Sequence, residues 1–182
     1  TAYVPKNGKI VLNNDDPLLC KQGRVAAKKF PVLTYAIHQS ARFQAKNIVF
    51  KGARNLRFMV NGKSIELNSC GMNNIYNALA AYACGSLFKV APAQIAAALK
   101  KFEFPQGRGQ IVRLGRGWLI NDAYNANPVS MRGALQTLDA LKVEGKKIVV
   151  AADMLELGRQ ERQLHRAIGR ATADSSADVS IT

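Results

Sequence analysis

Apolar residues in the first 70 positions follow the short periods of strands. Residues 9–13, Lys-Ile-Val-Leu-Asn, have the pattern of a short buried strand, and residues 32–37 that of a second. Between them, residues 14–17, Asn-Asp-Asp-Pro, predict a turn followed by the start of a helix. Residues 43–67 alternate loosely around Asn61-Gly62, the preferred dipeptide of a type I′ hairpin turn. This part of the chain is therefore predicted to be strand-rich.

The pattern changes to helical spacing after residue 70. Residues 73–87 are rich in alanine, with apolar residues three and four positions apart, and Asn73 or Asn74 is expected to cap this helix. Pro92 is suited to the first turn of a second helix, which we expect to continue to Lys101.

Residues 104–109, Phe-Pro-Gln-Gly-Arg-Gly, are the best candidate linker in the chain. Beyond it the pattern predicts a hairpin, a helix from Pro128 capped by Asn127, a buried apolar strand, a helix and a last strand, at residues 111–121, 128–141, 147–152, 161–173 and 177–182. Alternating strands and helices predict an α/β layer with parallel strands. Because the sequence ends on a strand with no helix after it, we expect a truncation there.

Composition narrows the class of protein. The chain has 26 Lys and Arg against 12 Asp and Glu, a formal charge of +14, which suits a polyanionic partner such as a nucleic acid, a nucleotide or a phosphosugar. The basic residues are dispersed singly or in pairs. Three cysteines, Cys20, Cys70 and Cys84, lack metal-ligand spacing and predict reduced thiols. No apolar run reaches the roughly 20 residues of a membrane span, and no secretory signal is visible, so we expect a cytoplasmic protein.

Several short motifs are weak evidence for a nucleotide or metal site. Gly62-Lys63-Ser64 resembles the end of a phosphate-binding loop, but that motif requires a glycine where Arg57 stands. Gly107-x-Gly109 lacks the third glycine of a dinucleotide fingerprint. His38 and His165 are too few and too far apart to indicate a metal site, and His165 is expected to be solvated on a charged helix.

Residues 121–128, Asn-Asp-Ala-Tyr-Asn-Ala-Asn-Pro, lie where a predicted strand ends and a predicted helix begins, the edge at which open α/β sheets place their ligands. Asp122 could accept hydrogen bonds from a ribose diol, Tyr124 offers an apolar face, and Asn125 offers both donor and acceptor. Asn127 precedes a helix start, whose N–H groups attract anions. The alternative is that these residues serve only as turn and cap residues.

Five blocks covering nearly the whole chain resemble the UDP-N-acetylmuramoyl-tripeptide–D-alanyl-D-alanine ligases of the Mur ligase family. Residues 122–131 are similar to D-S-Y-N-A-N-P-x-S-M, and residues 153–165 to D-M-L-E-L-G followed by a histidine; these two blocks are specific to this group. The others resemble N-A-D-D-P, G-x-H-N-x-x-N-A-L-A-A and the G-R pair at the domain junction, at residues 13–17, 71–81 and 107–108.

The resemblance implies an α/β fold in two parts. Residues 1–109 would be the C-terminal part of the central ATP-binding domain, and residues 110–182 the start of a Rossmann-like C-terminal domain with parallel strands. The family's phosphate-binding loop, carbamoylated lysine and Mg²⁺ ligands precede the matching segment, so no metal ligands are expected in these 182 residues.

The resemblance also implies nucleotide-binding roles. Asn77 would lie against the adenine with Asn74 supporting it, and Asp122 would hold the ribose hydroxyls. Arg108 would reach the ATP phosphates after domain closure as the catalytic residue, because a guanidinium suits a phosphate.

Other matching residues would line the cleft where nucleotide and incoming dipeptide meet: Tyr124, Asn125 and Asn127. Asp153 and Glu156 would lie on the next loop. Two roles are open for this loop: it could anchor the structure or contact the substrate.

Two positions depart from the family pattern. Asn73 replaces a histidine, whose ring chemistry is lost. Ala152 replaces the glycine before Asp153 and adds a Cβ where the backbone could need a positive φ, which puts the shape of the loop in doubt.

The implied activity is ATP-dependent amide bond formation in peptidoglycan precursor synthesis. ATP, with Mg²⁺, would phosphorylate the carboxyl group of UDP-MurNAc-tripeptide, and the amine of D-alanyl-D-alanine would attack the acyl phosphate. We expect a monomer without a nucleic-acid partner or stable membrane insertion, and no activity from this fragment alone. The alternatives are a ligase like folylpolyglutamate synthetase and a non-enzymatic, basic nucleic-acid-binding module.

Overall fold

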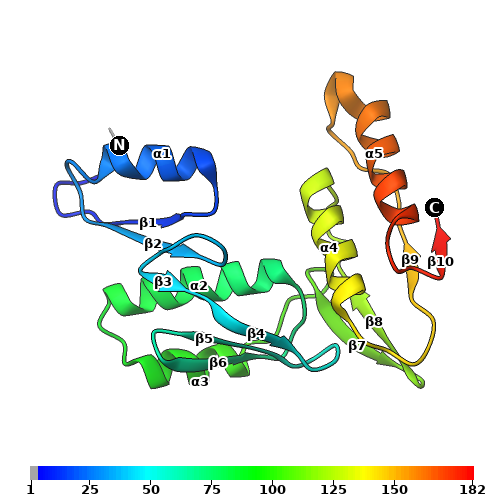
Figure 1. Ribbon diagram of the computed structural model, residues 1–182, viewed down its shortest axis with the longest axis horizontal. Coiled ribbons are helices and arrows are strands. Elements are labelled where there is room, and N and C mark those ends of the chain that lie inside the picture. Colours follow the sequence, from blue (N-terminus) through cyan, green and yellow to red (C-terminus); the bar gives the residue numbers. More distant parts are fainter. Residues whose placement is uncertain (1–3) are drawn as a thin grey trace. The chain divides into compact units, whose positions relative to one another are not determined.

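The computed structural model describes residues 4–182, which form two compact units. The first unit comprises most of residues 4–102, and the second comprises residues 103–182 with two short segments, 50–56 and 68–72. No helix within residues 4–182 is long and apolar enough to cross a membrane. Figure 1 shows the elements, which are β1 (Ile10–Asn13), α1 (Pro17–Ala26), β2 (Val32–Ala36), β3 (Phe43–Gln44), β4 (Lys46–Phe50), β5 (Leu56–Val60), β6 (Lys63–Leu67), α2 (Met72–Leu87), α3 (Pro92–Lys101), β7 (Gln110–Leu114), β8 (Gly117–Asn121), α4 (Pro128–Ala140), β9 (Ile148–Val150), the short 3₁₀ helix η1 (Gly158–Gln160), α5 (Glu161–Ala173) and β10 (Val179–Ile181).

The first unit contains a three-stranded parallel sheet in the order β1-β2-β3. Parallel neighbours need a crossover connection, and α1 provides the one between β1 and β2. This helix begins where the sequence predicts, because the carboxylate of Asp16 accepts hydrogen bonds from the N–H groups of Leu18 and Leu19, at 2.8 and 2.9 Å. The strand, turn and helix expected from residues 9–17 are thus confirmed.

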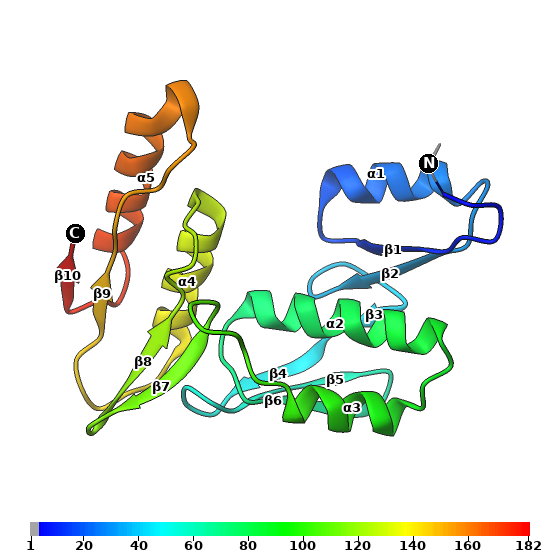
Figure 2. The same cartoon turned by 180° about the vertical axis from the view of Figure 1, so that it is seen from behind.

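A second sheet of the first unit joins β4, β5 and β6. Asn61 and Gly62 both have positive φ, 48° and 74°, as the two central positions of a type I′ turn require. The predicted hairpin is therefore confirmed, and Gly62-Lys63-Ser64 lies in its turn. Helix α3 packs beside β6 (Figures 1 and 2), and the core of this region contains Phe58 and Ile65.

The start of α2 differs from the prediction. The helix begins at Met72, directly after Gly71, whose φ is 98°. Asn73 and Asn74 therefore lie inside the first turn and do not occupy the cap position. The positive φ at Gly71 lets the chain turn into the helix before either asparagine is reached.

The second unit begins with the predicted hairpin, in which β7 and β8 pair antiparallel with Leu114 opposite Gly117. Helices α4 and α5 then pack against each other, and β9 and β10 pair in parallel. Asn127 caps α4, and α5 covers residues 161–173, both as predicted. The chain is an α/β protein.

The apolar strand expected at residues 147–152 is shorter than predicted and is not buried. Only Ile148–Val150 form β9, and the side chains of Ile148 and Val150 are 53% and 74% exposed. Within residues 4–182 β9 pairs with β10 alone, since β8 pairs with β7. A sheet of two strands leaves its outer edges and much of its faces open to solvent, so the apolar side chains of β9 are not fully buried.

Candidate functional site

The segment between β8 and α4 keeps its polar side chains at the surface. Asn127 uses its side-chain oxygen to cap α4, accepting hydrogen bonds from Val129 and Ser130 N–H groups at 3.0 and 2.9 Å. In return, the Asn127 N–H donates to Ser130 Oγ at 3.0 Å. Asp122 and Asn125, which have no such task, are exposed. Of the cleft residues expected here, Asn127 thus has a defined structural role as a helix cap.

Arg108 and Tyr124 lie together in the second unit. The guanidinium carbon of Arg108 stands 3.7 Å from the centre of the Tyr124 ring, a cation–π contact. The backbone supports this contact, because the Tyr124 N–H donates to the Gly107 carbonyl at 2.9 Å. Gly107 has a φ of 76°, and an added Cβ would stand 3.4 Å from the Tyr124 nitrogen. Because Gly107 has no side chain, its backbone can lie next to the Tyr124 backbone, and Arg108 follows it directly in the sequence.

Cys70 lies within electrostatic reach of Asp122 in the same unit. Burial raises the pKa of the Cys70 thiol to about 11, and the negative charge of Asp122 adds to that rise. The thiol is therefore protonated at neutral pH and is a poor nucleophile. Cys20, Cys70 and Cys84 are all free, in agreement with the reduced thiols expected from the sequence.

Asn74 and Asn77 belong to the first unit. They lie three residues apart on α2, so they share one side of the helix; Asn77 is exposed and Asn74 is half-buried. Arg108 and Asp122 belong to the second unit. The expected nucleotide-binding residues therefore form two groups, one in each unit.

Asp15 has a role that the sequence did not reveal. Its carboxylate accepts hydrogen bonds from the N–H groups of Ile37 and Gln39, at 2.6 and 2.7 Å, and from the hydroxyl of Tyr76 at 2.9 Å. It joins the end of β1, the segment after β2, and α2. Two adjacent acids before Pro17 were a signal of this, because only one of them can cap the helix.

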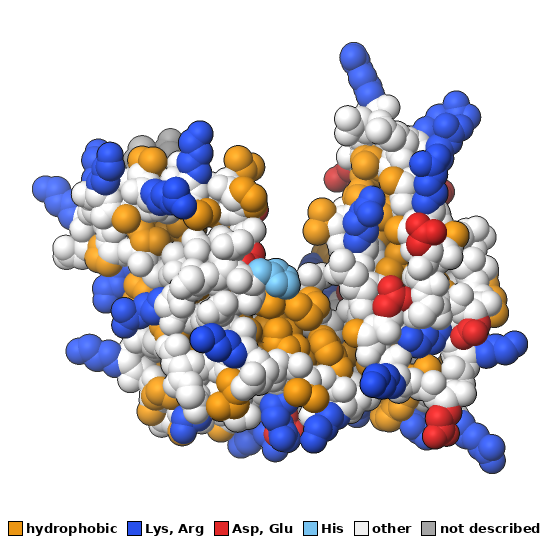
Figure 3. Space-filling model, viewed as in Figure 1, with side chains coloured by type: hydrophobic (Ala, Val, Ile, Leu, Met, Phe, Trp, Pro, Cys, Tyr) orange, Lys and Arg blue, Asp and Glu red, His pale blue; other side chains and the backbone are white. Residues whose placement is uncertain are grey.

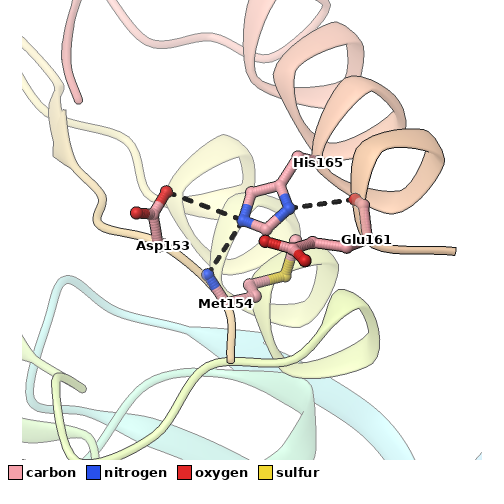
Figure 4. Close-up of polar contacts among 4 residues, drawn as sticks. All are labelled: Asp153, Met154, Glu161 and His165. Carbon is pink, nitrogen blue, oxygen red and sulfur yellow. Dashed lines mark hydrogen bonds and ion pairs between the residues drawn. The ribbon is translucent and has the colours of Figure 1, made fainter. Parts of the chain in front are cut away.

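His165 is not the solvated side chain expected from the sequence. Figure 4 shows its ring between the loop before η1 and the first turn of α5. Nε2 accepts a hydrogen bond from the Met154 N–H at 3.0 Å, and Nδ1 lies 3.0 Å from the Glu161 carbonyl oxygen. An Asp153 carboxylate oxygen stands 3.7 Å from Nε2. The expectation was wrong because α5 turns this position toward the loop.

The structure also answers whether the Cβ of Ala152 distorts the loop. Ala152 is not among the residues with positive φ; the left-handed residues of this loop are Glu156 (61°) and Gly158 (60°). The alanine therefore adds no strain at its own position, and the unusual backbone of the loop is at Glu156.

Charged and metal-ligating side chains are distributed over the described residues, 4–182. On the face drawn in Figure 3, Lys and Arg side chains are spread over the surface and do not gather in one patch. Within residues 4–182 no group of three or more His, Cys, Asp or Glu side chains could hold a metal ion. We therefore assign no metal ligand to these residues.

Two family models match the chain. The Mur ligase middle domain matches residues 1–85, and the Mur ligase glutamate ligase domain matches residues 107–182. The chain belongs to the Mur ligase family. Asn74 and Asn77 fall in the stretch that matches the middle domain, whereas Arg108, Asp122 and Tyr124 fall in the stretch that matches the glutamate ligase domain.

Individual Mur ligases support this membership. The chain is 31% identical over 178 residues to the UDP-N-acetylmuramoyl-tripeptide–D-alanyl-D-alanine ligase of Bacillus subtilis, covering 95% of this chain and 37% of that protein. It is 37% identical over 152 residues to the UDP-N-acetylmuramate–L-alanine ligase of Hydrogenobaculum, covering 81% and 33%. The chain thus spans between a third and two fifths of the length of these relatives.

A solved structure, MurF from Acinetobacter baumannii, superimposes with a TM-score of 0.88 at 26% identity, covering 98% of this chain and 39% of that one. The α/β fold of this Mur ligase chain is therefore that of the corresponding part of MurF. The Mur ligase family consists of ATP-dependent amide ligases.

Proposed function

We propose that this chain is part of a ligase that joins D-alanyl-D-alanine to UDP-MurNAc-tripeptide in peptidoglycan precursor synthesis. The proposal rests on the two blocks specific to that group, residues 122–131 and 153–165, which lie on loops and helix starts of the second unit. Loop residues differ more among relatives than core residues, so a match there bears on function more than on packing.

The contact between Arg108 and Tyr124 supports a role of Arg108 in binding ATP. The guanidinium of Arg108 lies over the Tyr124 ring, and a guanidinium held in this way can still bind two phosphate oxygens through its N–H groups. Within residues 4–182 Arg108 has no acidic partner that would occupy these N–H groups. Arg108 is thus suited to the phosphates of ATP, and the exposed carboxylate of Asp122 is suited to the ribose hydroxyls.

The remaining roles follow from the same proposal. Asn77, with Asn74 one turn before it, would face the adenine, and Tyr124 and Asn125 would line the cleft that receives the dipeptide. ATP would transfer its γ-phosphoryl group to the substrate carboxyl, and the dipeptide amine would displace phosphate and form the amide. Arg108 would stabilise charge on the transferring phosphoryl group.

We also propose that the two domains divide at Gly109, within residues 104–109. Limited trypsin digestion tests this division, because Arg108 lies in that segment and is exposed. Early cleavage at Arg108 is expected; early cleavage at Lys28 or Lys146 with Arg108 protected would contradict it.

The proposed role of Arg108 can be tested in a ligase-active polypeptide that includes this chain. Tyr124→Ala removes the ring under the guanidinium and should lower kcat/KM about 2- to 5-fold, which corresponds to about 0.5–1 kcal/mol. Tyr124→Phe keeps the ring and should retain kcat/KM. Equal losses in both variants would indicate that the hydroxyl, and not the stacking, matters.

The substrate and the alternatives are tested by the amine acceptor. Phosphate release with UDP-MurNAc-tripeptide should depend on D-alanyl-D-alanine; dependence on glutamate and a folate instead would favour the folylpolyglutamate-synthetase-like alternative. The chain alone should bind Mg-ATP more weakly than about 10 µM, or about −7 kcal/mol, because its 182 residues contain no phosphate-binding loop. A shift of random DNA by the chain at about 150 mM salt would favour the nucleic-acid-binding alternative.

A further inference from the structure

The ring of His165 lies between two backbone groups that require different protonation of its nitrogens (Figure 4). The Glu161 carbonyl can only accept, so Nδ1, 3.0 Å away, carries a proton. The Met154 N–H can only donate, so Nε2, 3.0 Å away, presents its lone pair. Both bonds exist together only in the neutral ring protonated at Nδ1.

The loop that His165 touches has few other anchors. We call residues 153–158 the acidic loop, after Asp153 and Glu156. Within the described residues, the bond from Met154 to His165 is the one backbone hydrogen bond made by residues 153–156. The Met154 side chain is 2% exposed and supplies the apolar anchor.

The acidic loop also contains a strained residue. Glu156 has a φ of 61°, and a left-handed conformation costs a non-glycine residue of the order of 1 kcal/mol or more. Such a backbone persists when its surroundings determine it. Because the loop has so few hydrogen bonds of its own, its conformation depends on the contact between Met154 and His165.

The position of the acidic loop connects it to function. It leaves the carboxyl end of β9, the edge at which open α/β sheets bind their ligands. Met154 and His165 point inward, while the Asp153 side chain is 91% exposed. Through its bond to Met154, His165 is therefore placed to act on that edge by holding the loop.

We propose that His165 is a positioning residue whose neutral, Nδ1-protonated ring holds the acidic loop in place, and that protonation of the ring releases Met154. A proton on Nε2 would face the Met154 N–H, and the ring would turn to Asp153, the acid 3.7 Å away. A role for the loop in the ligase reaction rests on the proposed function; the hydrogen bond and its loss on protonation do not.

Several other charged side chains lie on the elements around His165. The elements packed against it carry basic and acidic side chains, and Asp139 on α4 is bonded to Ser176 at 2.6 and 2.7 Å. The charged residues on these elements are Asp153 and Glu156 on the loop, Arg159 on η1, Glu161, Arg162, Arg166 and Arg170 on α5, and Arg132 and Asp139 on α4. Among these described residues, Asp153 is the one whose carboxylate makes an ion-pair contact with the ring, at 3.7 Å from Nε2.

The experiment follows the Met154 amide of the 182-residue chain by NMR between about pH 5 and 8, the range in which histidine changes charge. The wild-type Met154 amide should shift with pH, and its hydrogen exchange, corrected for the intrinsic pH dependence, should become about 10-fold faster at the acidic end. His165→Gln can offer an acceptor oxygen to the Met154 N–H but cannot titrate, so its amide should be protected and free of this transition.

His165→Ala removes the acceptor, and its Met154 amide should exchange about 10-fold faster than wild type at pH 8. The Ile168 amide, one turn further along α5, reports whether the helix is intact in each variant. A wild-type Met154 amide without a pH transition, or a transition retained in His165→Gln, would overturn the proposal. These two results do not require that His165→Ala folds.

An assay for D-alanyl-D-alanine ligase activity, made on a polypeptide that contains this chain, separates this inference from the proposed function. His165→Gln should retain kcat at pH 8 and lose less of it than wild type toward pH 6. If the Met154 amide responds as expected but no D-alanyl-D-alanine ligase activity is found, the proposed function fails and the positioning by His165 stands. If activity is present and the Met154 amide does not respond, the reverse holds.

Discussion

The two units differ in how completely they bury their apolar side chains. In the first unit, Phe58, Ile65 and Leu79 are at most 1% exposed, with helices covering the strands. In the second unit, Leu135 and Ile168 are buried between helices, whereas the strand residues Ile148 and Val150 stay largely exposed. The two blocks on which the proposed function rests, residues 122–131 and 153–165, lie in this less buried unit. The comparison indicates that the first unit carries most of the hydrophobic stability.

The largest expected effect comes from the core of the first unit. Phe58→Ala should lower the free energy of unfolding by about 3–5 kcal/mol, through lost burial and a new cavity. Trp118→Ala, at a residue of the second unit that is 45% exposed, should cost about 1 kcal/mol or less. Urea denaturation followed by circular dichroism measures both. Similar losses in the two variants would break the comparison between the units.

A polar anchor of the first unit should give the next largest effect. Asp15→Asn leaves N–H donors facing an amide and should lower the free energy of unfolding by about 1–3 kcal/mol. Asp16→Asn is the matched control, because asparagine caps a helix as well as aspartate does, and it should change little. If the control lost as much as Asp15→Asn, the anchoring by Asp15 would not be specific.

The same anchor predicts a pH dependence. Burial opposes ionisation of Asp15, but the hydrogen bonds from Ile37, Gln39, His38 and Tyr76 outweigh it and lower the pKa of Asp15 below 3.8. A lowered folded-state pKa gives stability that is fully present above the unfolded value and is lost as pH falls through the folded value. The stability difference between wild type and Asp15→Asn should therefore shrink below about pH 4.

The smallest effect is expected at a helix end of the second unit. Asn127→Ala removes the cap of α4 and should cost about 1 kcal/mol, with faster hydrogen exchange at the Val129 and Ser130 amides. Asn125→Ala, in the same exposed segment, should leave these amides unchanged. If both variants accelerated hydrogen exchange at these amides equally, the segment would be stabilised by something other than the Asn127 cap.

Local sequence rules predicted much of the fold. Asp16-Pro17 and Asn127-Pro128 each mark a helix start, and Asn61-Gly62 marks a hairpin, because capping and left-handed turns depend on residues next to one another. The predicted cap of α2, Asn73 or Asn74, was two or three residues too late, since Gly71 and not an asparagine makes the turn into the helix.

The candidate site could be predicted only in part. The spacing of residues 121–128 placed Asp122 and Tyr124 between a strand and a helix, and the structure has them there. The stacking of Arg108 on Tyr124 was not predictable, because it depends on a loop fold that brings Gly107 to the Tyr124 backbone.

By itself, the sequence determined the family, the order of most elements and the ends of several helices, since each of these depends on neighbouring residues. Only the tertiary structure decided the roles of Asp15 and His165 and the exposure of β9. Asp15 and His165 bond to backbone groups 22 and 11 residues away. The exposure of a strand depends on which strands and helices cover it. The apolar residues of β9 show that the strand is hydrophobic, but they do not show which elements pack against it.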